Sequence, residues 1–294
     1  MSPRLLLRHS TRAVSIACLL VAAGCGGNTA DRAPGAPALV AEPSTEQNSG
    51  RQPAPEMTLD QYVEAGVPEA DRGWSGSDMG RAAEALLLLA RGDAHRLPRY
   101  ESPSSGALFA RLMADDNLDF FRNPSIPLDQ RMPEGMAYMH SLNTIMKLYL
   151  EACNKGAVGS VELAELVGAQ LGLLVVMVQM ADEFVSMSDK NDPIYGIRIQ
   201  GLGQFRGLLA TAVAGTLQTL TERSTYDAAA LKRLLRRMQE TFPDILPQLP
   251  DASRKETLVR LRSFRNDPKM ADLSPELGEL VDRVEGLGDH SASP

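Results

Sequence analysis

The stretch "LVGAQLGLLVVMVQMA" at residues 166–181 decides the fold, because its apolar side chains lie nearly all round a helix. A second stretch, "GLGQFRGLLATAVAGTLQTL" at 201–220, follows after the polar loop "SDKND" at 188–192. Neither offers 18 uninterrupted apolar residues for a membrane span, since Glu165 borders the first stretch and Gln170 and Gln179 interrupt it, while Gln204 and Arg206 interrupt the second. The pair therefore predicts a buried central helical hairpin at about residues 160–222.

Helical signals continue on both sides of the hairpin, whereas strand-like alternation is almost absent. Ser253 and Glu256 have the spacing of a capping box, and Gly203 and Gly207 in the hairpin are expected to let a neighbouring backbone approach closely. The sequence predicts an all-α bundle of about eight or nine helices. We expect them near residues 58–66, 77–91, 104–122, 133–154, 160–187, 193–222, 226–241, 252–265 and 274–286.

The helix expected at 133–154 shows how its faces divide. Polar residues recur at spacings of three and four from His140 to Asn154, which places them on one stripe: His140, Thr144, Lys147, Glu151 and Asn154. Leu142 and Tyr149 lie on the opposite side, which is expected to face the core.

The N-terminus has a different composition from the helical region. Arg4, Arg8 and Arg12 precede an uncharged, mostly apolar run at 13–23, and "LLVAAGCGG" at 19–27 ends that run with small residues and Cys25. The run is too short to cross a bilayer and has the pattern of a secretory signal peptide. The stretch resembles the lipobox of bacterial lipoproteins, with Ala22 where leucine is usual. The resemblance covers residues 1–26 and implies cleavage before Cys25, acylation of that cysteine and anchoring in a membrane.

These features divide the chain into four segments. Residues 1–24 are the expected signal peptide, and 25–56 are a linker rich in proline, glycine and alanine, which is expected to be disordered because it holds too few apolar side chains to form a core. Residues 57–288 form the helical domain, and 289–294 a disordered tail. Without the leader, 27 basic and 37 acidic residues give a net charge of −10.

Residue types used in catalysis and metal binding form no familiar pattern. The sequence lacks H-E-x-x-H, paired C-x-x-C, G-x-S-x-G, S-x-x-K and G-x-x-x-x-G-K. The thirteen methionines are interpreted as core residues in preference to copper ligands, and the pair Asp115 and Asp116 as a solvated helix end. Cys153 is interpreted as a buried, unreactive thiol. We therefore predict no cofactor, no metal and no catalytic residues.

One charge asymmetry suggests a binding surface. Residues 223–269 contain eleven basic and six acidic residues, a local net charge of +5 in an acidic chain. A face that binds a partner protein or another anionic surface, such as a wall polymer or lipid headgroups, would use six of them: Lys232, Arg233, Arg236, Arg237, Arg254 and Lys255. The alternative is a solvated helix face balanced by acidic neighbours, and nucleic acid is not expected in an exported protein.

Taken together, these patterns predict a membrane-anchored lipoprotein that acts as a non-catalytic envelope adaptor or scaffold. One alternative is a binder of a small apolar or lipid ligand between the central helices, and another is an enzyme without a familiar motif. We expect the outer membrane, facing the periplasm, with the cell surface or the inner membrane as alternatives. The sequence predicts neither the oligomeric state nor the partner.

Overall fold

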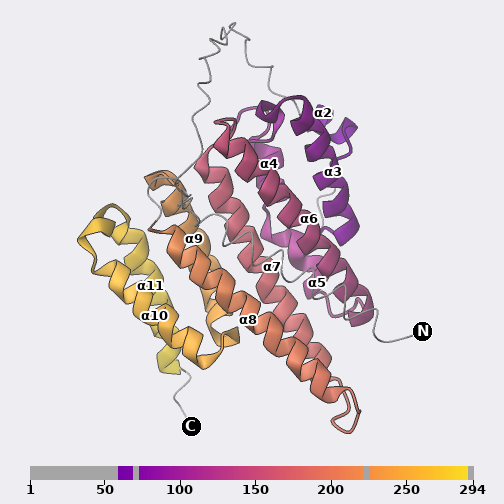
Figure 1. Cartoon of the computed structure of the whole chain (residues 1–294), viewed down its shortest axis with the longest axis vertical. Coiled ribbons are helices and arrows are strands. Elements are labelled where there is room, and N and C mark those ends of the chain that lie inside the picture. The colour runs from indigo at the N-terminus through magenta and orange to yellow at the C-terminus, as the bar shows by residue number, and fades with distance from the viewer. Residues whose placement is uncertain (1–58, 69–72, 222–225, 291–294) are drawn as a thin grey trace, which may run out of the picture.

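The computed structural model describes residues 59–68, 73–221 and 226–290, and all regular elements in these ranges are helical. The predicted all-α bundle is therefore confirmed (Figure 1). The expected signal peptide, Cys25, the linker and residues 291–294 lie outside the described residues.

Each helix is identified by its label in Figure 1. The helices are α2 (Leu59–Glu64), α3 (Gly76–Gly92), α4 (Gly106–Leu112), α5 (Asp119–Arg122), α6 (Leu128–Asn154), α7 (Ser160–Ser186), α8 (Tyr195–Thr219), α9 (Ala228–Ile245), α10 (Asp251–Arg265) and α11 (Ser274–His290). Short 3-10 helices lie at Ala94–Arg96, Asp115–Leu118, Leu246–Gln248 and Pro268–Leu273. The packing runs from α3 through α6, α7 and α9 to α11 and α10, while α8 lies along α7.

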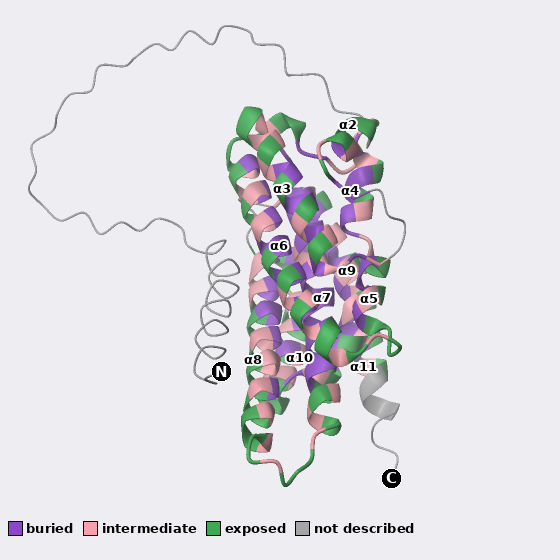
Figure 2. Cartoon of the chain, turned by 90° about the vertical axis from the view of Figure 1, so that its right-hand side faces the viewer, coloured by how far each residue is buried: buried purple, intermediate pink, exposed green. Residues whose placement is uncertain are grey.

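Helix α7 is the centre of the bundle and contacts α6, α8 and α9 (Figures 1 and 2). It is long and apolar enough to span a membrane, with a mean hydropathy of 1.9 over its most apolar 18 residues. Yet 83% of that stretch is buried inside the bundle. Its large side chains, such as Leu173 and Met177, are inaccessible to solvent. The predicted hairpin is present, and α7 is its buried half.

Helix α8 is the more exposed half of the hairpin. It buries Leu202, Leu209 and Val213 on the side that faces the bundle, whereas most of its residues before Leu202 are exposed. The expected close approach at Gly203 and Gly207 is wrong, because a Cβ atom placed on either glycine would have no atom within 4 Å. These glycines face open space.

The polar stripe of α6 is confirmed, since His140, Lys147 and Glu151 are exposed while Leu142 and Tyr149 are buried. The helix begins earlier than expected, at Leu128, and includes Pro133 near its N-terminus.

Two further expectations about the helices are wrong. The helix predicted at 104–122 is interrupted after Leu112, where Ala114 adopts an extended conformation. The buried Asn117 stabilises the break, because its side-chain amide donates to the carbonyl oxygen of Arg111 at 2.6 Å. Ser253 lies inside α10, which begins two residues earlier at Asp251, so it does not cap that helix.

Candidate functional site

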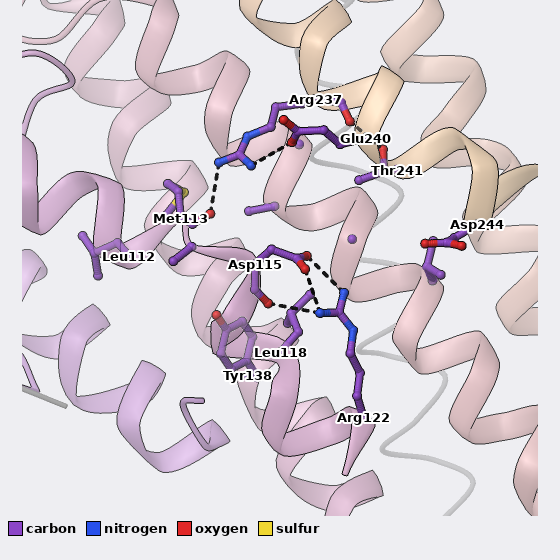
Figure 3. A pocket seen from close by; sticks show the side chains of 15 residues that line it. Leu112, Met113, Asp115, Leu118, Arg122, Tyr138, Arg237, Glu240, Thr241 and Asp244 are labelled. Atoms are coloured by element: carbon purple, nitrogen blue, oxygen red, sulfur yellow. Dashed lines mark hydrogen bonds and ion pairs between the residues drawn. The ribbon is translucent and has the colours of Figure 1, made fainter. Parts of the chain in front are cut away.

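A surface pocket of about 320 Å³ lies between α9 and the segment that joins α4 to α5 (Figure 3). The floor is formed by small and apolar residues of α7, and Tyr138 of α6 contributes to the wall. The polar lining groups come from three parts of the chain: Asp115 and Arg122, Tyr138, and Arg237, Glu240, Thr241 and Asp244. The volume is at the lower end of the range for small-molecule sites.

Two glycines of α7 shape the floor of this pocket. A Cβ atom on Gly168 would lie 2.9 Å from the side chain of Arg237, so the glycine lets that arginine cross the helix closely. A Cβ atom on Gly172 would lie 3.5 Å from Leu118 and 3.7 Å from a carboxylate oxygen of Asp115. A side chain at position 172 would therefore enter the pocket without meeting backbone.

The two arginines of the pocket are held by ion pairs. The guanidinium of Arg122 donates to both carboxylate oxygens of Asp115, at 2.7 and 3.0 Å. Arg237 donates to Glu240 at 3.1 Å and to the carbonyl oxygen of Met113 at 3.2 Å, as Figure 3 shows. Both cations are thus already paired with protein acceptors.

Tyr138 is the most buried polar side chain of the pocket, at 4% exposure. Its ring packs edge-on against Phe121, with the ring centroids 5.4 Å apart. Burial is the main cause of a pKa well above the ordinary value of 10.0, and the negative charges of Asp115 and Asp116 raise it further. The phenol therefore stays protonated at neutral pH.

The residues predicted as a basic face do not all point to one surface. Arg233 and Arg237 both donate to the carboxylate of Glu165 on α7, whose side chain is 2% exposed, and Arg237 does so at 2.7 Å. The guanidinium of Arg233 also lies over the ring of Tyr100, 4.3 Å from its centroid. This contact between α7 and α9 is an ionic cluster of one buried carboxylate and two partly exposed arginines.

The other four predicted residues lie on different sides. Lys232 and Arg236 approach Glu276 of α11 at 3.9 and 3.8 Å. Arg254 pairs with Asp251 in the first turn of α10 at 2.5 Å, and Lys255 is exposed, with no ion pair to any described residue. Most of the local positive charge is thus balanced by acidic neighbours in the fold.

A second surface feature is the tip of the α7–α8 hairpin, which extends beyond the neighbouring helices (Figure 1). Seven large apolar side chains are exposed in the described residues, and five of them lie between positions 184 and 199: Phe184, Met187, Ile194, Ile197 and Ile199. The guanidinium of Arg198 holds the two helices together, lying 4.8 Å from the ring centroid of Phe184 and 3.1 Å from Asp192. The tip therefore exposes several large apolar side chains, from the end of α7, the connecting loop and the start of α8.

A smaller cavity of about 60 Å³ lies among α6, α7 and α8. It includes Gln170, whose amide donates to Asn143 at 3.1 Å. Because small-molecule sites are usually 300–1,000 Å³, this cavity is too small for the lipid-like ligand considered as an alternative function.

Cys153 is half-buried and free. Burial raises the pKa of its thiol, and the charge of Glu162 adds to the effect, so the thiolate is disfavoured. No cluster of metal-ligating side chains occurs among the described residues.

Sequence reasoning missed the pocket. The sequence pattern indicates a solvated helix end at Asp115, and it gives no signal for Tyr138, Glu240 or Asp244. The available signal was the turn-forming run "ADDN" at 114–117, which interrupts the expected helix and brings Asp115 to the edge of the pocket.

Fold and surface together define an all-α domain with a polar pocket on one side and a projecting apolar hairpin tip. Comparison of the chain with protein-family models, with curated proteins and with solved structures finds no match. The function is therefore argued from the chemistry of these two surfaces.

Proposed function

We propose that the chain is a membrane-anchored lipoprotein whose helical domain is a non-catalytic envelope adaptor, and that the tip of the α7–α8 hairpin binds the partner protein. In this proposal the acylated Cys25 holds the protein in the outer membrane, facing the periplasm, with the cell surface and the inner membrane as alternative destinations. The linker at 25–56 allows the domain to reach partners at a distance from the membrane.

The observation that carries the proposal is the concentration of exposed apolar side chains at the hairpin tip. Single exposed apolar residues are common on protein surfaces, but five of the seven large ones in the described residues lie in this one segment, and such a concentration is typical of an interaction site. Phe184, Met187 and Ile197 are 43%, 72% and 55% exposed within a segment of fourteen residues. Burying them against a partner would remove apolar surface from water.

The charges around the tip favour a protein partner over an anionic membrane surface. Asp182, Glu183 and Asp192 each pair with an arginine of the chain, at 3.2, 2.6 and 3.1 Å. No surplus of positive charge is left, and attraction to anionic headgroups requires one. The partner is therefore expected to offer an apolar surface with little net charge.

The basic residues of α9 and α10 support this proposal less well than the tip does. Four of the six approach Glu165 or Glu276 within the bundle. Lys255 is the member of the set that is exposed without an ion pair to any described residue, so contacts with anionic polymers would depend mainly on α10.

Site-specific photo-crosslinking in intact cells of the native host tests the proposal. A benzoylphenylalanine is placed at Met187 on the tip or, as the matched control, at Val259 on α10, which is 62% exposed. We expect one discrete protein adduct from position 187 and none from position 259. The adduct should weaken when Ile197→Ser is added, whereas Leu88→Ser, another exposed apolar position, should leave it unchanged.

A Cys25→Ser version of each variant separates the anchor from the interface. If the protein is a tethered adaptor, loss of the cysteine moves it to the soluble fraction and lowers the yield of the adduct. Equal adduct patterns from Met187 and Val259, or no effect of Ile197→Ser, would rule out the tip as the interface.

A further inference from the structure

Met187 differs from the other described methionines in its exposure to solvent. The structure describes eleven of the thirteen methionines, all except Met1 and Met57. Ten of the eleven are buried or half-buried, and seven of these are at most 7% exposed. Met187 is 72% exposed, more than any other exposed large apolar side chain in the described residues. The interpretation of the methionines as core residues is therefore wrong for Met187.

The exposed sulfur of Met187 is open to oxidation. Hydrogen peroxide transfers one oxygen atom to a methionine thioether: an S–O bond forms, the O–O bond breaks, and the rest of the peroxide leaves as water. The reaction needs contact between sulfur and oxidant, so a buried methionine reacts slowly. Cys153, the one cysteine among the described residues, is half-buried, and burial raises the pKa of its thiol, which disfavours the reactive thiolate. Met187 is thus the sulfur that a peroxide reaches first in the described part of the chain.

The position of Met187 lets oxidation change the surface without changing the fold. Met187 directly follows α7, and its backbone N–H donates to the carbonyl oxygen of Glu183 at 3.0 Å. Its side chain is neither in the hydrophobic core nor among the side chains packed against the core. A sulfoxide at this position would therefore remove no core contact.

The neighbours of Met187 in the hairpin tip make its oxidation unfavourable for binding. Phe184, Ile194 and Ile197 are exposed large apolar side chains of the same segment. The thioether of methionine is apolar, whereas the sulfoxide carries a polar oxygen that water solvates. An apolar partner would remove this oxygen from water without offering a hydrogen bond, which costs free energy.

We propose that Met187 is a site of reversible oxidation by a hydroperoxide, and that its sulfoxide releases the partner from the hairpin tip. The reverse step is that of a methionine sulfoxide reductase, in which two thiols form a disulfide and the sulfoxide oxygen leaves as water. The modification site rests on the exposure of Met187, whereas the release of the partner rests on the proposed adaptor function.

Peroxide treatment of the purified full chain carrying Cys25→Ser tests the modification site. Mass spectrometry of its peptides follows the rate of oxygen addition at each methionine. We expect Met187 to react at least about tenfold faster than the half-buried Met132, Met136 and Met146, and this difference to vanish in urea. The circular dichroism of the helices should stay unchanged while Met187 alone is oxidised. Equal rates at Met187 and the half-buried methionines of the folded chain would overturn the proposal.

Photo-crosslinking from Ile194 tests the release of the partner, because it leaves Met187 in place. Benzoylphenylalanine at Ile194, which is 46% exposed on the tip, should give an adduct in untreated cells of the native host. Peroxide should lower the yield of this adduct by about fivefold or more. Met187→Leu keeps an apolar side chain of similar size without the sulfur and should retain the adduct after peroxide, whereas the matched Met136→Leu should lose it like the parent chain. Met187→Gln, which is polar without any oxidant, should give a low yield from the start.

Two results would overturn the release of the partner. One is an adduct that persists although mass spectrometry of the same sample shows Met187 oxidised. The other is an equal loss of the adduct in Met187→Leu, which would place the sensitive group elsewhere. No adduct from Ile194 in untreated cells would reject the hairpin tip as the interface, and the release with it, while the rates measured on the purified chain would still decide the modification site.

Discussion

The buried carboxylate of Glu165 provides the most direct test of how the bundle is held together. Its side chain is 2% exposed and accepts hydrogen bonds from Arg233 and Arg237, which join α9 to α7. Glu165→Gln removes the charge but keeps the size of the side chain. Breaking a buried ion pair on one side costs about 3–5 kcal/mol, because the remaining charge is left without compensation.

The cost of Glu165→Gln is expected at the low end of that range. The guanidinium side chains are 32% and 24% exposed, so water can partly solvate them after the change. We expect a loss of about 3 kcal/mol in the free energy of unfolding, which corresponds to roughly 6–12 °C in Tm for a domain of this size. The matched control is Glu240→Gln, because Glu240 also pairs with Arg237 but its own side chain is 60% exposed. That change should cost less than about 1 kcal/mol.

Urea unfolding followed by circular dichroism at 222 nm measures both variants in the full chain with Cys25→Ser. The fluorescence of Trp74, the single tryptophan and fully buried, gives an independent probe of the same transition. A Glu165→Gln variant within about 1 kcal/mol of the parent, or no less stable than Glu240→Gln, would refute the view that this cluster stabilises the core.

Other changes test separate parts of the structure. Gly207→Ala should raise the free energy of unfolding by up to about 1 kcal/mol, since this helical glycine faces open space. Gly76→Ala should lower the free energy of unfolding by more than about 2 kcal/mol, because its Cβ atom would collide with the carbonyl oxygen of Glu134. Thermal melts of the two variants test both expectations. Above about pH 10 the unfolded chain releases the phenol proton of Tyr138, whereas the folded chain keeps it because burial raises the pKa. The free energy of unfolding should therefore fall by up to about 1.4 kcal/mol per pH unit for this group. Urea titrations at about pH 9.5–11 measure this slope, and Tyr138→Phe should remove the part that Tyr138 contributes. The thiol of Cys153 should react with a disulfide reagent at pH 8 at least about tenfold more slowly in the folded chain than in urea.

The sequence predicts those parts of the fold that depend only on the pattern of apolar and polar side chains along a single helix. The apolar side chains on every side of α7 indicated burial, and the polar stripe from His140 to Asn154 indicated the exposed face of α6. Asn117 shows where this reasoning stops. Its amide ends α4 through a hydrogen bond to Arg111, a local effect that competes with the helical periodicity of the same segment.

The pocket was not predictable in the same way, because its polar residues come from segments far apart in sequence. Asp115 and Asp244 are 129 positions apart, and Tyr138 lies on a third element. None of them stands in a spacing that periodicity can detect. Arg233 and Arg237 show the opposite difficulty, because they are conspicuous in the sequence but their partner is not. Both pair with Glu165, which in the sequence is only a polar residue beside an apolar run.

Helix α7 is buried on nearly all sides while α8 is buried on one side, and this difference follows from the size of their apolar side chains. The middle of α7 is built from leucine, valine and methionine, whereas α8 owes much of its apolar character to glycine and alanine. Because hydrophobic stabilisation scales with the apolar area removed from water, small residues provide little force to cover α8 on every side. The single buried face of α8, which includes Leu209 and Val213, is enough to hold α8 on α7. The large side chains near its N-terminus, Ile194 and Ile197, lie past the end of the neighbouring helices, and there a partner could bury what the bundle does not.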